Sequence, residues 1–353
     1  MFTIDTHETL ARPAREAVRT LAARVAAHDG INPLNDEAEL ALNESADKWD
    51  GSSPRTNGTV PVRGQTEPFH PAQPPRHHHL LSRDGSTLVG YAFLAGSAAQ
   101  IAVDPDRRRQ GIGTELLHRL TQLDPATSLW SFGDLECARA FTRAAGYEPV
   151  RAILTMEADL ERFCLSADWN RPNRPRTGTV PIVRGLEPSQ SSANVRSFTP
   201  ADLDDLVRLN ARAFADHPEQ GRLTRADFET RMAAAWFDPE GLLIARNEQG
   251  DMTGFHWTKI HPEGYGEVYV LAVDPSASRH GLGRTLLNAG LIHLARRGLT
   301  TVRLWVEADN QRARTLYERS DFAVVSADLS YRKLESGESR VALGVFRDSE
   351  EER

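Results

Sequence analysis

Residues 273–287 read V-D-P-S-A-S-R-H-G-L-G-R-T-L-L, and residues 103–117 read V-D-P-D-R-R-R-Q-G-I-G-T-E-L-L. In each copy an apolar strand sequence ends at Val-Asp-Pro, a loop carries basic residues, and Gly-x-Gly opens an amphipathic helix sequence. The first N–H groups of a helix lack partners within it and lie at the positive end of its dipole, so such a turn can hold a pyrophosphate. The repeat therefore predicts two anion-binding turns in a duplicated chain.

The bulk composition limits the class of protein. The chain has 353 residues, and at roughly 150 residues per domain this length favours two domains. Apolar residues make up 40% and charged residues 26% of the sequence, which is ordinary for a globular protein. The net charge of -7 gives no sign of a general nucleic-acid or anionic-membrane surface. We expect neither partner, so an anionic ligand must be held locally.

Cysteine usage and the N-terminal sequence favour a reduced, cytoplasmic protein. Cys137 and Cys164 do not form the patterned set that a disulfide framework or a metal site requires. The N-terminus carries charges where a signal peptide needs an apolar run, and no segment reaches the ~18 apolar residues of a membrane span. The histidines at 77–79 cannot converge on one ion, because successive side chains in a strand point to opposite faces. We expect no metal, and a monomer.

The predicted helices and strands follow the same order in the two halves. We expect helices at 7–28, 36–42, 113–123, 200–214, 224–236, 283–297 and 310–319, and strands around 78–82, 88–94, 100–103, 241–246, 252–260, 267–273, 302–307 and 323–328. Helices, an antiparallel run of strands and then alternating strands and helices thus occur twice. The predicted fold class is α+β (α/β layered), with two tandem domains that each have a mixed, mostly antiparallel sheet flanked by helices.

Segments rich in Pro, Gly, Ser and Thr set the expected domain boundaries. The expected organisation is a first domain at 1–165 with a flexible insertion at 49–76, a linker at 166–192, a second domain at 193–335 and a flexible tail at 336–353.

The repeated stretch resembles the acyl-coenzyme A signature of the GCN5-related N-acetyltransferases (GNAT). In that family R-x-x-G-x-G follows V-x-P, and the first copy matches it at Arg108, Gly111 and Gly113. The second copy departs by one residue, with Ser278 where Arg or Gln is usual, although basic residues follow. The resemblance implies a GNAT-type fold for each domain and acetyl-CoA as the co-substrate.

Residues 307–322 resemble the second signature of the family, N-x-x-A-x-x-x-Y followed by Gly-Phe. Asn310, Ala313 and Tyr317 match it, and Asp321 replaces the glycine. The resemblance implies that the following residues of the first copy bind the cofactor: Ile101, Ala102, Val103, Arg109, Gln110, Gly111, Ile112, Gly113 and Thr114. In the second copy they are Leu271, Ala272, Val273, Ser278, Arg279, His280, Gly281, Leu282, Gly283, Arg284, Asn310, Gln311, Arg312, Ala313, Arg314 and Thr315.

The second half also resembles one tandem branch of the family, through H-P-E-Q-G, A-W-F-D-P-E-G-L, G-F-H-W-T-K-I-H-P and G-E-V-Y-V-L-A-V-D-P. Members of that branch transfer acetyl to the cysteine amine of cysteinyl-glucosaminyl-inositol, a small pseudo-disaccharide. The resemblance implies substrate contacts from Asp36, His217, Lys259, Glu267 and Trp305. The competing interpretations are a helix cap for Asp36, a surface lysine for Lys259 and a core tryptophan for Trp305.

Acetyl transfer needs a group that accepts the amine proton, donors for the oxyanion and a proton for the leaving thiolate. Glu267 stands six residues before Val273, and in a strand of period two Glu267, Tyr269, Leu271 and Val273 share one face. A carboxylate among apolar neighbours on that face is the expected base, acting directly or through water. Tyr317 is the expected acid. The alternative for Tyr317 is a packing role alone. An edge-strand carboxylate in solvent is the alternative for Glu267.

The first half lacks these two groups. Ser97 stands six residues before Val103, and Phe141 occupies the place where a tyrosine hydroxyl is wanted. We therefore expect the first domain to bind coenzyme A without turnover. Two other functions stay open from the sequence: acetylation of an aminoglycoside or peptide amine, and coenzyme A sensing without catalysis.

Overall fold

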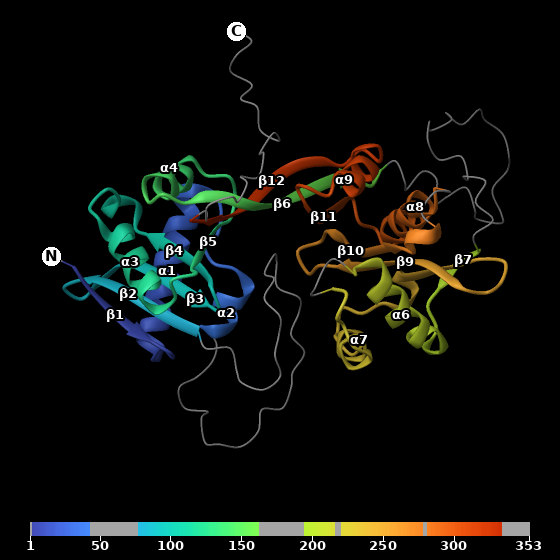
Figure 1. The fold of residues 1–353 in the computed structure, drawn as a ribbon, viewed down its shortest axis with the longest axis horizontal. Helices are drawn as coiled ribbons and strands as arrows, with labels where there is room; N and C mark the ends of the chain where they lie inside the picture. Colours follow the sequence, from blue (N-terminus) through green and yellow to red (C-terminus); the bar gives the residue numbers. More distant parts are fainter. Residues whose placement is uncertain (1, 43–76, 162–193, 216–219, 278–280, 334–353) are drawn as a thin grey trace, which may run out of the picture. The chain divides into compact units, whose positions relative to one another are not determined.

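The computed structural model describes residues 2–42, 77–161, 194–215, 220–277 and 281–333, which form two compact units (Figure 1). Unit 1 takes its described residues from Met1–Leu154, Glu307–Asp309 and Ser326–Arg353, and unit 2 from Thr155–Val306 and Asn310–Val325. The expected insertion at 49–76, linker at 166–192 and tail at 336–353 lie outside the described residues.

Unit 1 has a sheet with the strand order β1-β2-β3-β4-β5-β12. β4 and β5 pair in parallel, and the other pairs with a recorded register are antiparallel. Its elements are β1 (Thr3–His7), α1 (Arg12–Asp29), α2 (Asp36–Ala41), β2 (His77–Asp84), β3 (Thr87–Ala95), β4 (Ala98–Val103), η2 (Pro105–Arg107), α3 (Ile112–Leu123), β5 (Ser128–Ser131) and α4 (Glu136–Ala144).

Unit 2 repeats this plan with the strand order β6-β11-β10-β9-β8-β7, in which β10 and β11 are the parallel pair. Its elements are β7 (Asn194–Ser197), η4 (Pro200–Asp202), α6 (Leu203–Ala213), α7 (Arg225–Met232), η5 (Pro239–Gly241), β8 (Leu242–Arg246), β9 (Met252–Ile260), β10 (Gly266–Val273), η6 (Pro275–Ala277), α8 (Leu282–Arg296), β11 (Thr301–Glu307) and α9 (Gln311–Glu318).

Two long strands are divided between the units. β6 (Glu148–Asp159) passes from unit 1 to unit 2 after Leu154, and β12 (Ala323–Arg332) passes from unit 2 to unit 1 after Val325. The strand that pairs with β5 in unit 1 therefore comes from the end of the chain. The units are interleaved in sequence, whereas the expected domains at 1–165 and 193–335 were contiguous.

The helices cover both faces of each sheet. In unit 1 the apolar stripe of α1, including Val18, Leu21 and Val25, packs against one face, and α3 packs against the other through Ile112 and Leu116. Pro13 lies in the first turn of α1, and Gly30 ends this helix in the left-handed conformation at φ 78°. In unit 2, α6 and α7 take the place of α1 and α2, while α8 takes the place of α3.

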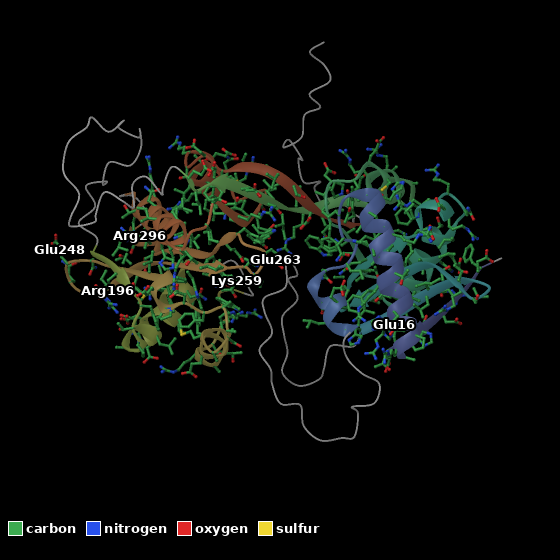
Figure 2. The ribbon with its side chains drawn as sticks, turned by 180° about the vertical axis from the view of Figure 1, so that it is seen from behind. Glu16, Arg196, Glu248, Lys259, Glu263 and Arg296 are labelled. Carbon is green, nitrogen blue, oxygen red and sulfur yellow. The ribbon has the colours of Figure 1, made fainter. Side chains whose placement is uncertain are left out.

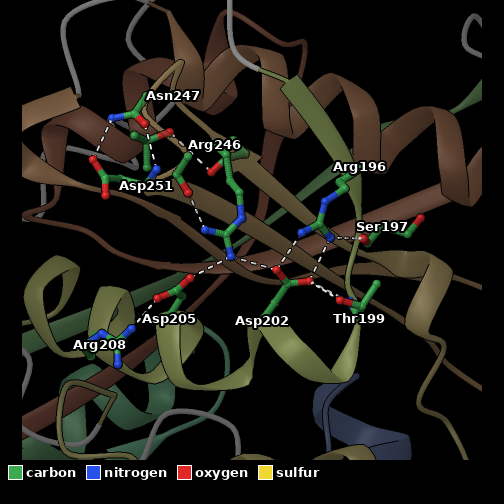
Figure 3. Close-up of polar contacts among 12 residues, drawn as sticks. Arg196, Ser197, Thr199, Asp202, Asp205, Arg208, Arg246, Asn247 and Asp251 are labelled. Atoms are coloured by element: carbon green, nitrogen blue, oxygen red, sulfur yellow. Dashed lines mark hydrogen bonds and ion pairs between the residues drawn. The ribbon is translucent and has the colours of Figure 1, made fainter.

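A network of charged side chains fastens the edge of the unit 2 sheet to the start of α6 (Figure 3). The Asp202 carboxylate is buried and accepts hydrogen bonds from Arg196 at 2.6 and 2.8 Å and from Arg246 at 2.8 Å. Arg196 lies on β7 and Arg246 on β8. These hydrogen bonds, Arg196 first, hold the pKa of Asp202 well below its usual value. Asp202 thereby joins two strands to one helix.

Each of the seven predicted helices is confirmed in position, as is each of the eight predicted strands. Two predicted helices were too long at one end. The helix predicted from residue 7 begins at Arg12, because His7 belongs to β1, and the helix predicted to end at residue 236 stops at Met232, before an irregular stretch that leads into η5. β1, β5, β6, β7 and α4 were not predicted. No helix among the described residues is long and apolar enough to cross a membrane.

Candidate functional site

Both repeated turns have the backbone that their glycines predict. Gly111 and Gly281 precede α3 and α8 in the left-handed region, with φ of 83° and 73°. At the second glycine of each motif, a Cβ on Gly113 would lie 3.3 Å from the Phe141 ring, which is a tight contact. A Cβ on Gly283 would lie 3.6 Å from Leu316, which is an ordinary contact distance. A side chain at the first position would be strained. The described parts of the two motifs, 103–117 on one side and 273–277 with 281–287 on the other, are therefore alike in structure as well as in sequence.

The aspartate of each Val-Asp-Pro is held by an arginine of the first long helix of its unit. Asp104 makes an ion pair with Arg24 of α1 at 2.7 Å. Asp274 makes one with Arg212 of α6 at 2.8 Å. Each aspartate also accepts a backbone hydrogen bond from the residue two positions on, at 3.1 and 3.0 Å. The same contacts thus fix the start of both loops.

Arg108, the consensus arginine of the first copy, is bound within the protein. Its guanidinium donates to the two carboxylate oxygens of Asp29 at 2.9 and 2.6 Å, and to the Val103 carbonyl at 3.3 Å. The hydrogen bond to Asp29 raises the pKa of Arg108. Arg108 therefore joins the end of α1 to the loop, and its neighbour Arg109, at φ 62°, stays exposed.

Unit 1 contains a pocket of about 470 Å³ at the predicted cofactor position. All the residues implied for the first copy line it except Gln110, which hydrogen-bonds Arg107 at 3.1 Å. The parallel pairing of β4 with β5 is recorded only at Ala98 and Ala99, so the strands separate beyond these positions. The glycine turn and the opening between the strands thus line the same pocket.

In unit 2, β10 and β11 also separate, because their pairing is recorded only for Gly266 and Glu267. β10 has in addition a bulge between Val268 and Val270, where Tyr269 is the extra residue. The register of β4 on β3 shows no such irregularity. The bulge distinguishes the two copies.

The bulge overturns the predicted common face of β10. Glu267 and Tyr269 lie on the side of α6 and α7, since Tyr269 packs with Trp257 and Glu267 is opposite Lys259. Leu271 and Val273 pack instead against α8. One extra residue moves every later side chain to the opposite face. The period-two argument failed because it assumed a regular strand.

Glu267 is 8% exposed and lies 2.5 Å from Nε2 of His261. Lys259 stands opposite it on β9 and Arg303 opposite it on β11. A carboxylate removed from solvent beside three basic groups can accept a proton or bind an amine. Glu267 is thus buried, and it is not an edge-strand carboxylate in solvent.

Lys259 is 9% exposed, and its ammonium lies 5.2 Å from the centroid of the Trp236 ring and 5.7 Å from that of Tyr269. Figure 2 labels it near the same end of the β9–β10 hairpin as Glu263. Arg231 donates to the Tyr269 hydroxyl at 3.2 Å, and burial raises the pKa of Tyr269 to about 12. Lys259 is not an exposed surface lysine.

On β11, Val302, Leu304 and Val306 are buried while Arg303 and Trp305 alternate with them and are half-buried. Because Arg303 is in register with Glu267, Trp305 lies on the Glu267 face of the sheet. Trp305 is therefore half-buried, and it is not the fully buried core tryptophan of the competing interpretation.

Tyr317 is buried in α9, and its ring lies 5.7 Å from that of Phe322. Burial raises the pKa of its hydroxyl well above 10, so it keeps its proton at neutral pH. Asn310 is the N-cap of α9 and accepts a hydrogen bond from the Ala313 N–H at 3.0 Å. Gln311, Arg312, Arg314 and Thr315 belong to the first turns of this helix.

The position in unit 1 that corresponds to Glu267 is one residue away from the position that was inferred by counting back along the sequence. Through the pairings with β3 and β9, the counterpart of Glu267 is Ala98 and not Ser97, because the bulge adds a residue to β10. Lys259 likewise corresponds to Ala95. Unit 1 therefore has two small apolar side chains where unit 2 has a carboxylate and an ammonium.

The counterpart of Tyr317 is Thr142 and not Phe141. The N–H of Tyr147 bonds the Thr142 carbonyl at 2.9 Å, just as the N–H of Phe322 bonds the Tyr317 carbonyl at 3.1 Å. Phe141 instead approaches the second glycine of its motif as Leu316 does. The Thr142 hydroxyl donates to the Ala138 carbonyl at 2.9 Å, so unit 1 still lacks the proton donor.

Several predicted site residues cannot be placed. Ser278, Arg279, His280 and His217 lie outside the described residues, as does the side chain of Asp36. Asn35 is the N-cap of α2, since its side chain accepts a hydrogen bond from the Ala38 N–H at 2.9 Å. The described residues hold no group of three or more His, Cys, Asp or Glu placed for a metal ion. Sequence reasoning gave no role to His261, Trp236 or Arg303, although Trp236 and His261 lie within the stretches A-W-F-D-P-E-G-L and G-F-H-W-T-K-I-H-P that carry the family resemblance.

A sequence profile of the acetyltransferase (GNAT) family matches the chain over residues 46–145 and 203–322, which together exceed half of its length. The chain therefore belongs to the GNAT family of acetyltransferases and carries two copies of its domain. It is an acetyl-CoA-dependent N-acetyltransferase.

Relatives define the group within this family. The mycothiol acetyltransferase of Kytococcus sedentarius is 37% identical, over 92% of this chain and 95% of the relative. That of Clavibacter michiganensis subsp. michiganensis is 39% identical, over 91% and 93%. These relatives place the chain among the mycothiol acetyltransferases of the family.

A solved structure supports the fold independently. A tandem GNAT protein from the clavulanic acid biosynthesis pathway matches with a TM-score of 0.60 at 17% identity, over 96% of this chain and all of that one. The predicted α+β class with two tandem GNAT domains is confirmed.

Proposed function

We propose that the chain transfers acetyl from acetyl-CoA to the cysteine amine of cysteinyl-glucosaminyl-inositol, giving mycothiol and coenzyme A. The observation that carries this proposal is the buried group around Glu267 in unit 2, with Lys259 and His261 beside it. Unit 1 has alanines at the two matching positions of β3 and β4. Similarity to the mycothiol acetyltransferases supports the choice of substrate.

Acetyl-CoA binds unit 2 along β10 and at the glycine turn before α8. The turn offers the first N–H groups of α8 to the diphosphate, in a left-handed conformation that leaves the backbone uncovered. Leu271 to Val273 lie where β10 has separated from β11, so their backbone groups are available to the pantetheine amides and the thioester carbonyl. Residues 310–315 contact the cofactor from the start of α9.

In the chemical step the amine nitrogen attacks the thioester carbon, and its proton passes to Glu267, directly or through water. A free α-amine has a pKa of about 7.7–8.0, so little basicity is demanded of the carboxylate. When the tetrahedral intermediate collapses, the C–S bond breaks and Tyr317 gives its proton to the thiolate. Burial keeps Tyr317 protonated until that moment.

Lys259 and Trp305 lie on the Glu267 face of the sheet and contact the hydroxyl-rich acceptor. The acceptor contacts implied for Asp36 and His217 stay predictions, because these side chains lie outside the described residues. Each buried hydroxyl of the pseudo-disaccharide needs a hydrogen-bond partner, which explains a site rich in polar side chains. Unit 1 binds coenzyme A in its pocket without turnover. The cytoplasmic location and the monomeric state stay predictions.

The test is to incubate the enzyme with acetyl-CoA and three amines: the cysteinyl pseudo-disaccharide, an aminoglycoside and a peptide. Mass spectrometry should find an N-acetyl product with a free thiol only from the first. Glu267→Gln should lower kcat by roughly 10²–10⁴-fold. An N-acetylated aminoglycoside or peptide at a comparable kcat/KM would reject the substrate assignment. An unchanged kcat for Glu267→Gln would reject the base.

A further inference from the structure

One wall of the unit 1 pocket comes from the end of the chain. β12 pairs antiparallel with β5, so that Tyr331 lies opposite Leu129. Both residues line the pocket. They lie on its β5 and β12 side, whereas the glycine turn follows β4. The exchange of β12 into unit 1 therefore places a tyrosine in a site whose other walls come from the first half of the sequence.

Tyr331 is 3% exposed, and its ring packs in the same core cluster as Leu129 and Leu329. Its hydroxyl oxygen is buried and has no hydrogen-bond partner among the described residues. A buried hydroxyl without a partner is unfavourable, since it has lost its bonds to water and gained none. Tyr331 lines the pocket, and a small shift of its side chain would bring the buried hydroxyl within reach of a ligand that supplies the missing partner.

The rest of the pocket indicates the chemistry of that ligand. At one end, Arg109 and the left-handed Gly111 turn suit an anionic diphosphate. Toward Tyr331 the wall becomes apolar, with Ile101, Leu129 and Trp130. A molecule with an anionic head and a long, mostly apolar arm that carries amide and hydroxyl groups fits this gradient, and coenzyme A is such a molecule.

We propose that the Tyr331 hydroxyl hydrogen-bonds the pantetheine arm of coenzyme A in unit 1, so that the C-terminal strand completes the cofactor site of the first half. This inference rests on the proposed coenzyme A site in unit 1. Neither family signature includes Tyr331, and only the strand exchange brings it to the pocket.

The experiment compares the full-length wild type with Tyr331→Phe by calorimetric titration with coenzyme A, and by native mass spectrometry for stoichiometry. The wild type should bind two equivalents. Tyr331→Phe should bind the unit 1 equivalent roughly 3- to 10-fold more weakly, as expected for one lost hydrogen bond. Its melting temperature without ligand should equal or exceed that of the wild type, because the hydroxyl has no partner to lose.

Two controls separate binding from a structural effect. Tyr147→Phe changes a buried tyrosine of the same core cluster that does not line the pocket, and its coenzyme A affinity should match that of the wild type. Adenosine 3′,5′-bisphosphate lacks the pantetheine arm, so Tyr331→Phe and wild type should bind it equally.

The outcomes are distinct. One equivalent of coenzyme A bound to wild type would overturn the unit 1 site itself, and Tyr331 with it, while leaving catalysis in unit 2 intact. Two equivalents with equal affinities in wild type and Tyr331→Phe would overturn the role of Tyr331 alone. Equal weakening of coenzyme A and the bisphosphate, or a lower melting temperature for Tyr331→Phe, would also overturn it.

Discussion

The carboxylate of Glu267 lies 2.5 Å from Nε2 of His261, across the turn that joins β9 to β10. His261 is itself fixed, because its ring stacks on Tyr265 with centroids 4.3 Å apart. The guanidinium of Arg303 lies 4.7 Å from the Tyr265 ring centroid. The turn therefore holds the proposed base in place from the side opposite the bulge.

His261→Asn should lower kcat roughly tenfold while the KM for acetyl-CoA stays unchanged, because His261 positions Glu267 and is remote from the glycine turn. Steady-state kinetics with the acceptor saturating provide the measurement. Tyr265→Phe keeps the stacked ring and should stay within twofold of wild type. Equal kcat values for His261→Asn and wild type would show that Glu267 does not depend on this contact.

Arg212→Ala should raise the KM for acetyl-CoA about three- to fivefold with little change in kcat. Arg212 fixes Asp274 at the start of the cofactor loop, and a partly exposed ion pair contributes about 0.5–1 kcal/mol. Arg24→Ala removes the matching contact in unit 1 and provides the control. If Arg24→Ala raised the KM as much as Arg212→Ala, the loop of unit 2 would not be the cause.

The sequence revealed the duplicated motifs, the helices and the residues that carry chemistry, because these depend on local pattern and spacing. It could not reveal the bulge at Tyr269. Counting back from Val273 and Val103 assumes that the two strands are equally regular. It therefore made Ser97 the equivalent of Glu267, whereas the strand pairings make Ala98 its equivalent. One inserted residue has no sequence signature when both strands are apolar.

The exchange of β12 and β6 between the units could not be predicted from the local sequence pattern either. β6 was not predicted at all, and nothing in Leu329 or Tyr331 says which strand the residues of β12 will pair with. Strand pairing is decided by contacts between distant segments, and the same holds for the Glu267 surroundings. His261 and Trp236 lie within stretches that carry the family resemblance, but they join Glu267 and Lys259 only in the folded chain.

Tyr317→Phe should lower kcat about 100-fold and leave the KM for acetyl-CoA nearly unchanged, since a phenyl ring packs equally well but gives no proton. Because burial raises the pKa of Tyr317 above its unfolded value near 10, the protonated tyrosine stabilises the fold below pH 10, and this stability is lost as the pH rises further. Denaturant unfolding of wild type at pH 9 and pH 11 should show a decline that is smaller in Tyr317→Phe. Equal declines in the two proteins would contradict the raised pKa.

Asp202→Asn should reduce the free energy of unfolding of unit 2 by about 2 kcal/mol at pH 7, because it leaves Arg196 and Arg246 beside a neutral amide. The pKa of Asp202 is depressed in the folded state, so the carboxylate stabilises above its unfolded pKa of about 3.9, and this stability is lost as the pH falls through the folded pKa. The difference between wild type and Asp202→Asn should therefore be complete above about pH 4 and shrink below it. Asp205→Asn is the matched control: it also bonds Arg246 but is half-exposed, and should cost less than about 1 kcal/mol. A pH-independent difference for Asp202→Asn in urea unfolding between pH 3 and pH 7 would show that packing, and not the ionised carboxylate, fastens β7 and β8 to α6.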